Sequence, residues 1–253
     1  MRVAELSAQL GSISSTLKSL EAKGVLRIEA RRRFRSAMPA VPQNEKKGLS
    51  PRIIPQLTEG QAASVEAIGR ACEAGRGEVV CGVTGSGKTE VYLRAIERVL
   101  AEGRTACVLV PEISLTPQTV ARFRSRFGDL VAVMHSRMSP GERYDQWDFI
   151  RSGAARVVVG ARSALFTPLA NRGLIIIDEE HEGSYKQDSA PRYLARDVAV
   201  WMARRSGAAV VLGSATPSVE TLHACETDPL WHRVELPARA NGRPLPEVRV
   251  VDM

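Results

Sequence analysis

One eight-residue segment constrains the fold of this chain more than any other. It reads GVTGSGKT, follows a short apolar run and opens a helix-periodic stretch. Its glycines let the backbone point N–H groups inward at phosphate oxygens, and the N-terminus of the helix favours an anion. The alternative is a glycine-rich turn with an exposed lysine. The pattern predicts a phosphate-binding loop formed by Gly82, Val83, Thr84, Gly85, Ser86, Gly87, Lys88 and Thr89.

From residue 78 onward, short apolar runs alternate with helix-periodic stretches. The runs are apolar on both faces, which is typical of strands covered by helices on two sides. The order predicts an α/β fold with a doubly wound parallel sheet. The predicted strands are 78–82, 106–110, 130–134, 156–159, 174–177 and 209–212. The predicted helices between them include 88–102, 116–127, 140–152 and 194–205.

An acidic segment, LIIIDEEH at 174–181, completes the predicted catalytic site. An apolar strand delivers Asp178 to the carboxyl edge of the sheet, where it is expected to hold Mg²⁺ together with the Thr89 hydroxyl. Glu179 is expected to orient and polarise the attacking water, and Lys88 to reach the β- and γ-phosphates of ATP. An acidic strand end is by itself usually a solvated loop. Its place in a parallel sheet, downstream of the phosphate-binding loop, favours the catalytic interpretation.

A third motif, GSATP at 213–217, follows another apolar strand. Small and hydroxyl side chains at the carboxyl end of a strand can lie against 178–181 and respond to what occupies the nucleotide site. An ordinary strand-to-helix turn is the alternative for this motif.

The N-terminal residues carry a different pattern. Residues 3–23 predict two short helices broken at Gly11, then a strand over 25–29 and the basic run RRRFR at 31–35. This order resembles the later part of a winged-helix unit. The basic run either contacts DNA phosphates or is a solvated wing tip.

Proline-rich residues 36–57 predict a linker, and a helical period resumes at 58–72 with Thr58 as its N-cap. Four regions are therefore expected. They are a partial winged-helix element at 1–35, a linker at 36–57, an ATP-binding lobe at 58–236 and a tail at 237–253.

Charge and cysteine content narrow the class of partner. The chain has 35 Lys and Arg against 28 Asp and Glu, and the net charge of +7 favours nucleic acid over membrane. Its four cysteines show no CxxC or CxxH spacing, so no zinc site and no disulfide framework are predicted. There is neither a signal peptide pattern nor an apolar run long enough to span a bilayer. We expect a soluble intracellular protein.

In their order, the three motifs resemble those of superfamily 2 helicases. Longer segments resemble one family within it, the replication-restart helicases of the PriA type, and the resemblance covers residues 58–222. It implies a RecA-like lobe that couples ATP hydrolysis to 3′-to-5′ DNA translocation, in replication restart and primosome assembly, when joined to a second lobe. The segments are GVTGSGKTEVYL (82–93), VLVPEISLTPQ (108–118), VVVGARSALFTP (157–168), IIIDEEHEGSYKQD (175–188), PRYLARDVA (191–199) and GSATPSVET (213–221).

The resemblance also implies roles for residues outside the three motifs. Gln61 is expected to read adenine, since its amide can both donate and accept, unless it is an ordinary surface residue of its helix. Four residues correspond to segments that line the single-strand track: Pro111, Glu112, Ser114 and Arg162. On that track a guanidinium suits pairing with phosphate, and an ordinary surface ion pair is the alternative for Arg162.

Residues 181–197 resemble the aromatic-rich loop by which this family couples DNA contact to hydrolysis. The alternative for one or both of its tyrosines is packing on the lobe itself, and the sequence leaves this open. The resemblance implies stacking on bases by Tyr185 and Tyr193, and phosphate contacts by Lys186, Arg192 and Arg196.

Family members also have a 3′-DNA-end-binding domain and a second RecA-like lobe with a zinc-binding insertion, and neither is found in these 253 residues. We therefore expect part of a longer bacterial cytoplasmic protein, which by itself binds ATP and hydrolyses it only at a trace rate. The expected cofactors are ATP and Mg²⁺, without zinc. The expected partners are single-stranded and forked DNA, other primosome proteins and single-strand-binding proteins, but no membrane.

Other functions remain open on the sequence. A kinase or transport ATPase would share the phosphate-binding loop, although paired Asp178 and Glu179 with GSATP argue against both. Another superfamily 2 DNA translocase would share all three motifs. A non-catalytic DNA-binding protein that uses residues 1–35 would bind DNA equally well after Lys88→Ala.

Overall fold

The computed structural model describes residues 6, 13–28, 55–75, 77–240 and 242, and the chain divides into two units, Met1–Phe34 and Arg35–Met253. In the first unit, helix α2 (Ser14–Ala22) has Lys23 as its C-cap and is followed by Gly24, which has a φ of 71°. The N–H groups of Gly24 and Val25 donate to the carbonyls of Glu21 and Leu20, so carbonyls at the helix end find partners.

The strand expected at 25–29 is not found in its described part. Residues 25–28 are irregular, and the N–H of Ile28 donates to Oε1 of Glu21 at 2.8 Å. That prediction was wrong because an extended segment needs a neighbouring strand, and none is found among the described residues of this unit. Apart from Leu6, the expected first helix and the basic run at 31–35 lie outside the described residues, as do residues 36–54 of the linker.

The second unit is built on a parallel sheet of seven strands in the order β3-β4-β2-β5-β8-β1-β9. This confirms the predicted doubly wound α/β fold. Each predicted strand forms, with ends within two residues of those expected. The strands are β1 (Gly77–Gly82), β2 (Thr105–Leu109), β3 (Val131–Met134), β4 (Val157–Gly160), β5 (Arg172–Asp178), β8 (Ala209–Ser214) and β9 (Trp231–Leu236).

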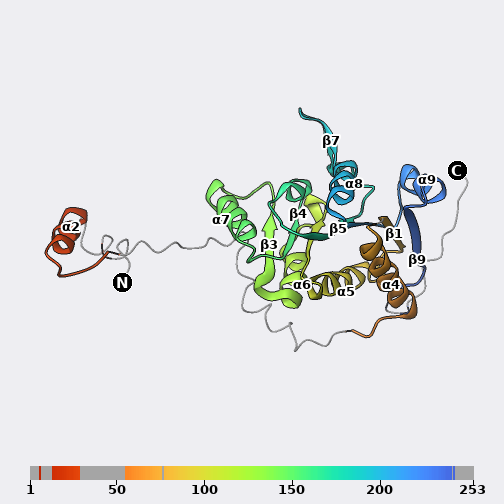
Figure 1. Ribbon diagram of the computed structural model, residues 1–253, viewed down its shortest axis with the longest axis horizontal. Helices are drawn as coiled ribbons and strands as arrows, with labels where there is room; N and C mark the ends of the chain where they lie inside the picture. The colour runs from red at the N-terminus through yellow and green to blue at the C-terminus, as the bar shows by residue number, and fades with distance from the viewer. Residues whose placement is uncertain (1–5, 7–12, 29–54, 76, 241, 243–253) are drawn as a thin grey trace, which may run out of the picture. The chain divides into compact units, whose positions relative to one another are not determined.

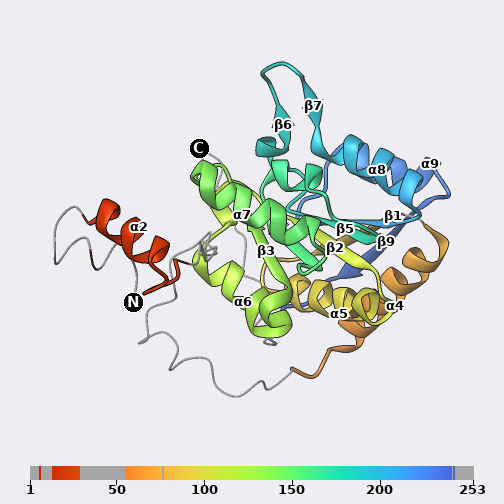
Figure 2. The same ribbon diagram turned by 60° about the vertical axis from the view of Figure 1, so that its left-hand side comes forward.

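Helices cover both faces of the sheet (Figures 1 and 2). One face carries α4, α5 and α6, and the other carries α7, α8 and α9, as expected for right-handed crossovers that change direction along the sheet. The α-helices are α4 (Glu59–Ala74), α5 (Lys88–Ala101), α6 (Pro117–Phe127), α7 (Pro140–Arg151), α8 (Ala195–Ser206) and α9 (Val219–Thr227). Short 3₁₀ helices are η1 (Glu112–Ser114), η2 (Gly128–Leu130), η3 (Arg162–Phe166) and η4 (Gly183–Tyr185).

The core lies between the sheet and its helices. All four apolar residues from Leu174 to Ile177 are fully buried, because β5 is a central strand with helices on both sides. Burying each such side chain contributes roughly 1.5–3 kcal/mol, which explains why continuous Ile and Val runs predicted these strands well. None of the helices in the described ranges is long and apolar enough to cross a membrane.

Three features were not predicted: helix α9, edge strand β9, and a small antiparallel hairpin of β6 (Lys186–Gln187) and β7 (Tyr193–Leu194). Strand β9 reads WHRVEL and is largely exposed at the edge of the sheet, so it has no apolar run. The hairpin strands have only two residues each, too few for a recognisable period.

The sheet order brings the three sequence motifs together. Strands β5, β8 and β1 are neighbours, and all three end at the same edge because the sheet is parallel. Asp178 pairs in register with Gly213, and Cys81 with Ser214. The acidic segment, GSATP and the phosphate-binding loop therefore meet at one carboxyl edge.

Candidate functional site

The phosphate-binding loop joins β1 to α5, as predicted. Gly85 and Gly87 have φ values of 83° and 84°, which residues with a Cβ rarely adopt. At Gly87 there is no space for a side chain either, since a Cβ would lie 2.3 Å from Nε2 of Gln61. The loop is thus held in a conformation that requires glycine.

Lys88 links the loop to the acidic segment. Its Nζ donates to the carbonyl of Gly82 at 2.9 Å and lies 3.4 Å from Oε1 of Glu179. The ammonium is nearly buried, whereas a third of the Glu179 side chain is exposed to solvent. The structure therefore brings two of the predicted catalytic residues into direct contact.

Asp178 is held by two tyrosines that the sequence reasoning did not assign to this task. The hydroxyl of Tyr92, on α5, donates to Oδ1 of Asp178 at 3.0 Å. The hydroxyl of Tyr185 donates to the backbone carbonyl of Asp178 at 2.6 Å. Burial, followed by the neighbouring charge of Glu179, raises the pKa of the Asp178 carboxyl above its ordinary value. Binding a cation at this carboxylate would favour its ionised form.

Gly213, the first residue of GSATP, explains why a tyrosine fits beside Asp178. A Cβ at Gly213 would lie 1.6 Å from the Tyr92 hydroxyl. The glycine therefore opens the space from which Tyr92 reaches Asp178. Tyr92 lies within one of the segments that carry the family resemblance, but an apolar helix face gives no sign that a hydroxyl is needed there.

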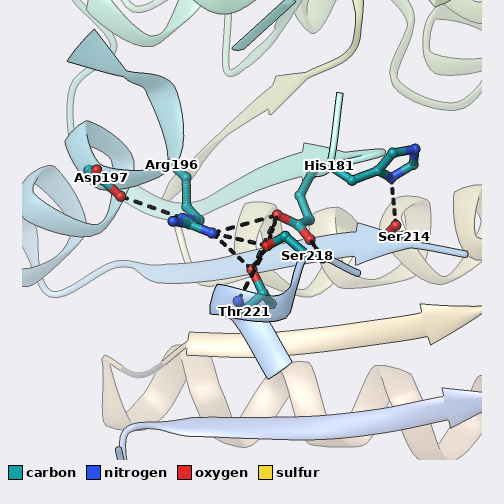
Figure 3. A network of polar contacts seen from close by, with 7 residues as sticks. His181, Arg196, Asp197, Ser214, Ser218 and Thr221 are labelled. Carbon is teal, nitrogen blue, oxygen red and sulfur yellow. Dashed lines mark hydrogen bonds and ion pairs between the residues drawn. The ribbon is translucent and has the colours of Figure 1, made fainter. Parts of the chain in front are cut away.

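Glu179 has an unusual backbone. Its φ is 47°, in the left-handed region that residues other than glycine seldom occupy. Its Oε1 faces Lys88 and its Oε2 lies 3.8 Å from Nδ1 of His181. Nδ1 of His181 in turn lies 2.8 Å from the hydroxyl oxygen of Ser214 (Figure 3). The acidic segment and GSATP are thus in contact through side chains, as expected.

Glu180 is the centre of a polar network with Arg196, Ser218 and Thr221, three residues that Figure 3 labels. Its carboxylate accepts from the N–H of Ser218 at 2.6 Å, from the Ser218 hydroxyl at 3.3 Å and from the Thr221 hydroxyl at 3.2 Å. Nη1 of Arg196 lies 3.9 Å from Oε2 and also donates to both hydroxyls. Sequence reasoning gave Glu180 no role, because it cannot tell which acidic residue at a strand end turns inward.

The loop and the acidic segment enclose one pocket of about 540 Å³. It is lined by the loop residues 83–89, by Asp178 and Glu179, and by further residues such as Pro55, Leu93 and Arg122. A pocket of this size can hold a nucleotide. The buried Oγ of Ser86 has no hydrogen-bond partner among the described residues, so the loop retains polar capacity that a phosphate could satisfy.

The pocket also suits a magnesium ion bound together with phosphate. The Thr89 hydroxyl and the Asp178 carboxylate both line it, and both are oxygen ligands of the kind Mg²⁺ prefers. In the described part of the chain, no group of three or more His, Cys, Asp or Glu side chains is arranged to hold a metal by itself. The expectation that this chain has no zinc site stays a prediction.

Gln61 does not line this pocket. It is buried at the first turn of α4, where its Oε1 accepts from the N–H of Thr58 at 3.0 Å in a capping box. Its Nε2 donates to the carbonyl of Ser86 at 2.8 Å. The amide therefore supports the phosphate-binding loop from behind. It is not the surface residue considered as the alternative, and its contact with adenine stays a prediction that requires this amide to change partners.

Arg162 binds the protein itself in this structure. Its guanidinium donates to the carbonyls of Ser184 (3.1 Å) and Lys186 and to the side chain of Gln187, and it lies over the ring of Tyr193 at 5.6 Å. Neither the predicted phosphate contact nor the alternative, an acidic partner, corresponds to these contacts. An arginine that follows a strand carries no sign in the sequence of which carbonyls it will meet.

The two tyrosines of the coupling segment occupy different environments. Tyr185 is 2% exposed and packs in the core, so stacking on a base does not fit its position, and for this residue the packing alternative is correct. Tyr193 is half-buried, and its ring meets that of Phe166 edge to face with centroids 5.3 Å apart. Since Phe166 is 46% exposed, this aromatic pair borders the surface.

The remaining predicted DNA-contact residues are spread along the hairpin and the lobe. Lys186 and Arg192 are exposed on the hairpin, which projects from the lobe in Figure 2. Arg196 is instead engaged with Glu180 at the start of α8. Following β2, Glu112 is exposed, Ser114 is half-buried and Pro111 is buried. Their contacts with DNA stay predictions.

The chain matches known proteins over the region that forms this site. A sequence profile of the DEAD/DEAH box helicases matches residues 58–225. The replication restart protein PriA of Bacillus subtilis is 48% identical over 252 residues, which are 99% of this chain and 30% of that protein. The PriA protein of a Synechocystis species is 43% identical over 257 aligned residues, which cover 100% of this chain and 30% of that protein.

The helicase domain of Pyrococcus furiosus Hef has a similar fold, with a TM-score of 0.53 at 19% identity over 75% of this chain and 39% of that one. These matches confirm the resemblance to replication-restart helicases and the RecA-like character of the lobe. The chain spans about 30% of the length of the PriA proteins that it matches.

Proposed function

The chain belongs to the DEAD/DEAH box helicase family, and from this membership we propose that it is the ATP-binding lobe of a DNA helicase of the replication-restart kind. The observation that carries the proposal is the 3.4 Å approach of Lys88 to Glu179 within one pocket. A phosphate-binding cation and a candidate general base face the same space, as ATP hydrolysis requires.

Nucleotide binding would use the loop and its helix. The N–H groups of 83–89 and the N-terminus of α5 surround the β- and γ-phosphates, and Lys88 leaves the Gly82 carbonyl to pair with them. Magnesium held by Thr89, Asp178 and the nucleotide would neutralise charge on the phosphate oxygens. Gln61 keeps the loop in place through the carbonyl of Ser86.

Hydrolysis would depend on Glu179, whose carboxylate lines the pocket and can accept a proton from an attacking water. When Lys88 moves to the phosphates, Oε1 of Glu179 is released for this task. Tyr92 and Tyr185 keep Asp178 in position from two sides, so the neighbouring Glu179 starts from a fixed backbone.

Coupling to DNA would pass through the hairpin. Arg162 fastens the base of the hairpin, and Arg196 at the start of α8 is joined to the acidic segment through Glu180. Lys186 and Arg192 are exposed, with Asp188 as the partner of both, and they could exchange these contacts for phosphates of single-stranded or forked DNA. Tyr193 with Phe166 offers an aromatic surface for bases.

Several parts of the proposal concern the intact protein. There, a second RecA-like lobe would close on the nucleotide and supply further charge stabilisation, and the two lobes would move 3′ to 5′ along DNA. The relatives' name, replication restart protein, suggests the same process here, in the bacterial cytoplasm and with other primosome and single-strand-binding proteins. Residues 1–35 would be part of a winged-helix element, 36–57 a linker, 58–236 the lobe and 237–253 a tail.

Calorimetry with ATP and Mg²⁺ tests the nucleotide site directly. We expect the 253-residue chain to bind ATP, and Lys88→Ala to weaken binding by about tenfold or more, since hydrogen bonds to charged groups contribute roughly 1.5–3 kcal/mol. The matched control is Lys186→Ala on the exposed hairpin, which should bind ATP as the parent chain does. Equal affinity of the Lys88 variant and the parent would contradict the assignment.

Turnover tests Glu179 separately. In the protein with both lobes, Glu179→Gln should retain ATP affinity and lose about 10²–10⁴ in rate, because an amide cannot act as a base. Glu182→Gln, three residues further on, is the control and should keep its rate. Unchanged turnover in the Glu179 variant would assign the role of base to another residue.

A further inference from the structure

Glu179 has a backbone conformation that its own side chain does not favour. Among the described residues, only Asn171 and Glu179 have a positive φ without being glycine, at 49° and 47°. Asparagine tolerates this region, whereas for glutamate the close contact of Cβ with the backbone makes it unfavourable. Strain of this kind persists only where neighbouring contacts hold the residue in place.

The contacts that hold Glu179 come from the residues on either side. On one side, the Asp178 carbonyl accepts from Tyr185 and its carboxylate from Tyr92. On the other side, the N–H of Glu180 donates to the carbonyl of Gly213 at 3.1 Å, and its side chain enters the network of Figure 3. Two anchored residues therefore fix both peptide groups of Glu179.

The anchor at Glu180 is strong because its carboxylate is buried. The residue is 7% exposed, and a buried carboxylate that lacks partners is very unfavourable. Here the Ser218 N–H, the two hydroxyls and Arg196 supply the partners that compensate for lost water. Any movement of Glu180 would leave several of these groups unsatisfied at once.

The network also joins three separate segments. Ser218 and Thr221 begin α9 just after GSATP, since Ser218 is the N-cap of that helix. Arg196 lies two residues after the last strand residue of the hairpin, Leu194, and its Nε is 3.4 Å from Asp197. The Glu180 side chain therefore connects the acidic segment to the residues that follow GSATP and to those that follow the hairpin.

We propose that Glu180 is the positioning residue of this ATP site: anchored by Arg196, Ser218 and Thr221, it keeps Glu179 in the left-handed conformation that turns its carboxylate toward Lys88. The inference rests on the proposed function for the catalytic role of Glu179, whereas the backbone conformation of Glu179 is independent of that function. If Glu180 merely fastened α9 to the lobe, its loss would lower stability and leave the conformation of Glu179 unchanged.

A matched pair of variants measures that conformation. Glycine adopts a positive φ freely and alanine does not, so Glu179→Gly should melt about 2–4 °C above Glu179→Ala in the parent chain. Both variants lack the carboxylate, so the gap reports the backbone alone. With Glu180→Ala added to both variants, this gap in melting temperature should fall to less than half. Residue 179 can then leave the left-handed conformation, so alanine is no longer at a disadvantage.

A second pair is the control. Asn171→Gly and Asn171→Ala should show a gap that Glu180→Ala leaves unchanged, because Asn171 is in a separate exposed loop. If Glu180→Ala does not fold, Glu180→Gln decides, since its amide has a single accepting oxygen and can accept from the Ser218 N–H or from Arg196 but not from both. The absence of a gap at position 179 in the parent chain, or a gap that survives loss of the Glu180 carboxylate, overturns the proposal.

Single-turnover hydrolysis gives an independent readout. In the protein with both lobes, with enzyme in excess over ATP, the Glu180→Ala variant should hydrolyse at least tenfold more slowly while its ATP affinity changes less than twofold, since Glu180 does not line the pocket. An unchanged rate would overturn the proposal. Failure of the proposed function would look different: the parent chain would not bind ATP, or would bind it independently of Lys88, whereas the melting gap would persist.

Discussion

Two regions that are adjacent in the chain differ in burial. One is the carboxyl edge of the sheet at residues 178–180, called the ATP-site edge below, and the other is the β6–β7 hairpin. At the edge, Asp178 and Glu180 are enclosed and each carboxylate has its hydrogen-bond partners. On the hairpin, residues 188–192 are exposed, and Arg162 clamps its base. The edge is rigid because moving it would leave buried charge without partners, whereas the hairpin is open to a large ligand.

The two tyrosines show this difference within a single segment. Tyr185 belongs to the rigid edge and Tyr193 to the open side, although both were predicted to stack on bases. Substitution by Ala separates them. Tyr185→Ala should lower the free energy of unfolding by about 3–5 kcal/mol, as loss of a buried aromatic does, and Tyr193→Ala by about 1 kcal/mol. Chemical denaturation of the 253-residue chain measures both.

The same pair should also differ in DNA response. In the protein with both lobes, Tyr193→Ala should reduce stimulation of hydrolysis by single-stranded DNA and leave the basal rate nearly unchanged, since stacking contributes roughly 1–3 kcal/mol per base. Tyr185→Phe, which removes only the hydroxyl, should leave stimulation intact. Equal destabilisation by Tyr185→Ala and Tyr193→Ala would remove the distinction between the two regions.

Much of the lobe could be predicted because its signals are local and repeated. Continuous apolar runs identify strands buried on both faces, and the phosphate-binding loop identifies where one strand meets a helix. Strand β9 has neither signal, because an edge strand with exposed polar residues has no apolar period. Because parallel strands end at one edge of a sheet, the sequence was enough to predict that Lys88, Asp178 and Glu179 lie close together.

The residues that hold the site in place could not be predicted, because their task depends on contacts far apart in the sequence. Tyr92 lies 86 positions from Asp178, and Glu180 lies 41 from Thr221. A helix face containing tyrosine or a strand followed by glutamates looks the same whether the side chain turns inward or outward. Arg162 illustrates the same limit: the family resemblance implied a phosphate contact, whereas its nearest acceptors are carbonyls of the protein.

Gly213 tests how tightly the edge is packed. Gly213→Ala should lower the free energy of unfolding by about 1–3 kcal/mol, because its Cβ would lie 1.6 Å from the Tyr92 hydroxyl in a buried sheet. Gly183→Ala, beside the hairpin, has open space and should change it by less than about 0.5 kcal/mol. Adding Tyr92→Phe should restore part of the loss at Gly213, whereas no restoration would place the strain elsewhere.

Arg162→Lys tests the clamp at the base of the hairpin. A lysine cannot reproduce the fork that reaches Ser184, Lys186 and Gln187, so the hairpin should open more often. A loss of about 1.5 kcal/mol corresponds to roughly tenfold faster trypsin cleavage after Arg192. Arg151→Lys on α7 should leave this cleavage unchanged, and unaltered cleavage in both variants would show that the hairpin does not depend on Arg162.

The smallest change in the free energy of unfolding is expected for substitution of Asp178. The proposed function needs this carboxylate in its ionised form, whereas the stability of the fold favours its neutral form. Burial and the charge of Glu179 raise the pKa of this carboxyl, so the folded chain holds the proton more tightly than the unfolded chain. Stability therefore falls as pH rises from the unfolded pKa through the raised folded value, and at pH 7 the ionised carboxylate is a net cost. Asp178→Asn still accepts from Tyr92, so it should be more stable than the parent at pH 7 by about 0.5–1 kcal/mol, with the difference shrinking toward pH 4. Asp188→Asn on the exposed hairpin should change stability at pH 7 by less than about 0.5 kcal/mol. Denaturation across this pH range decides: an advantage that grows on acidification would mean that the buried edge stabilises the charge of Asp178 after all.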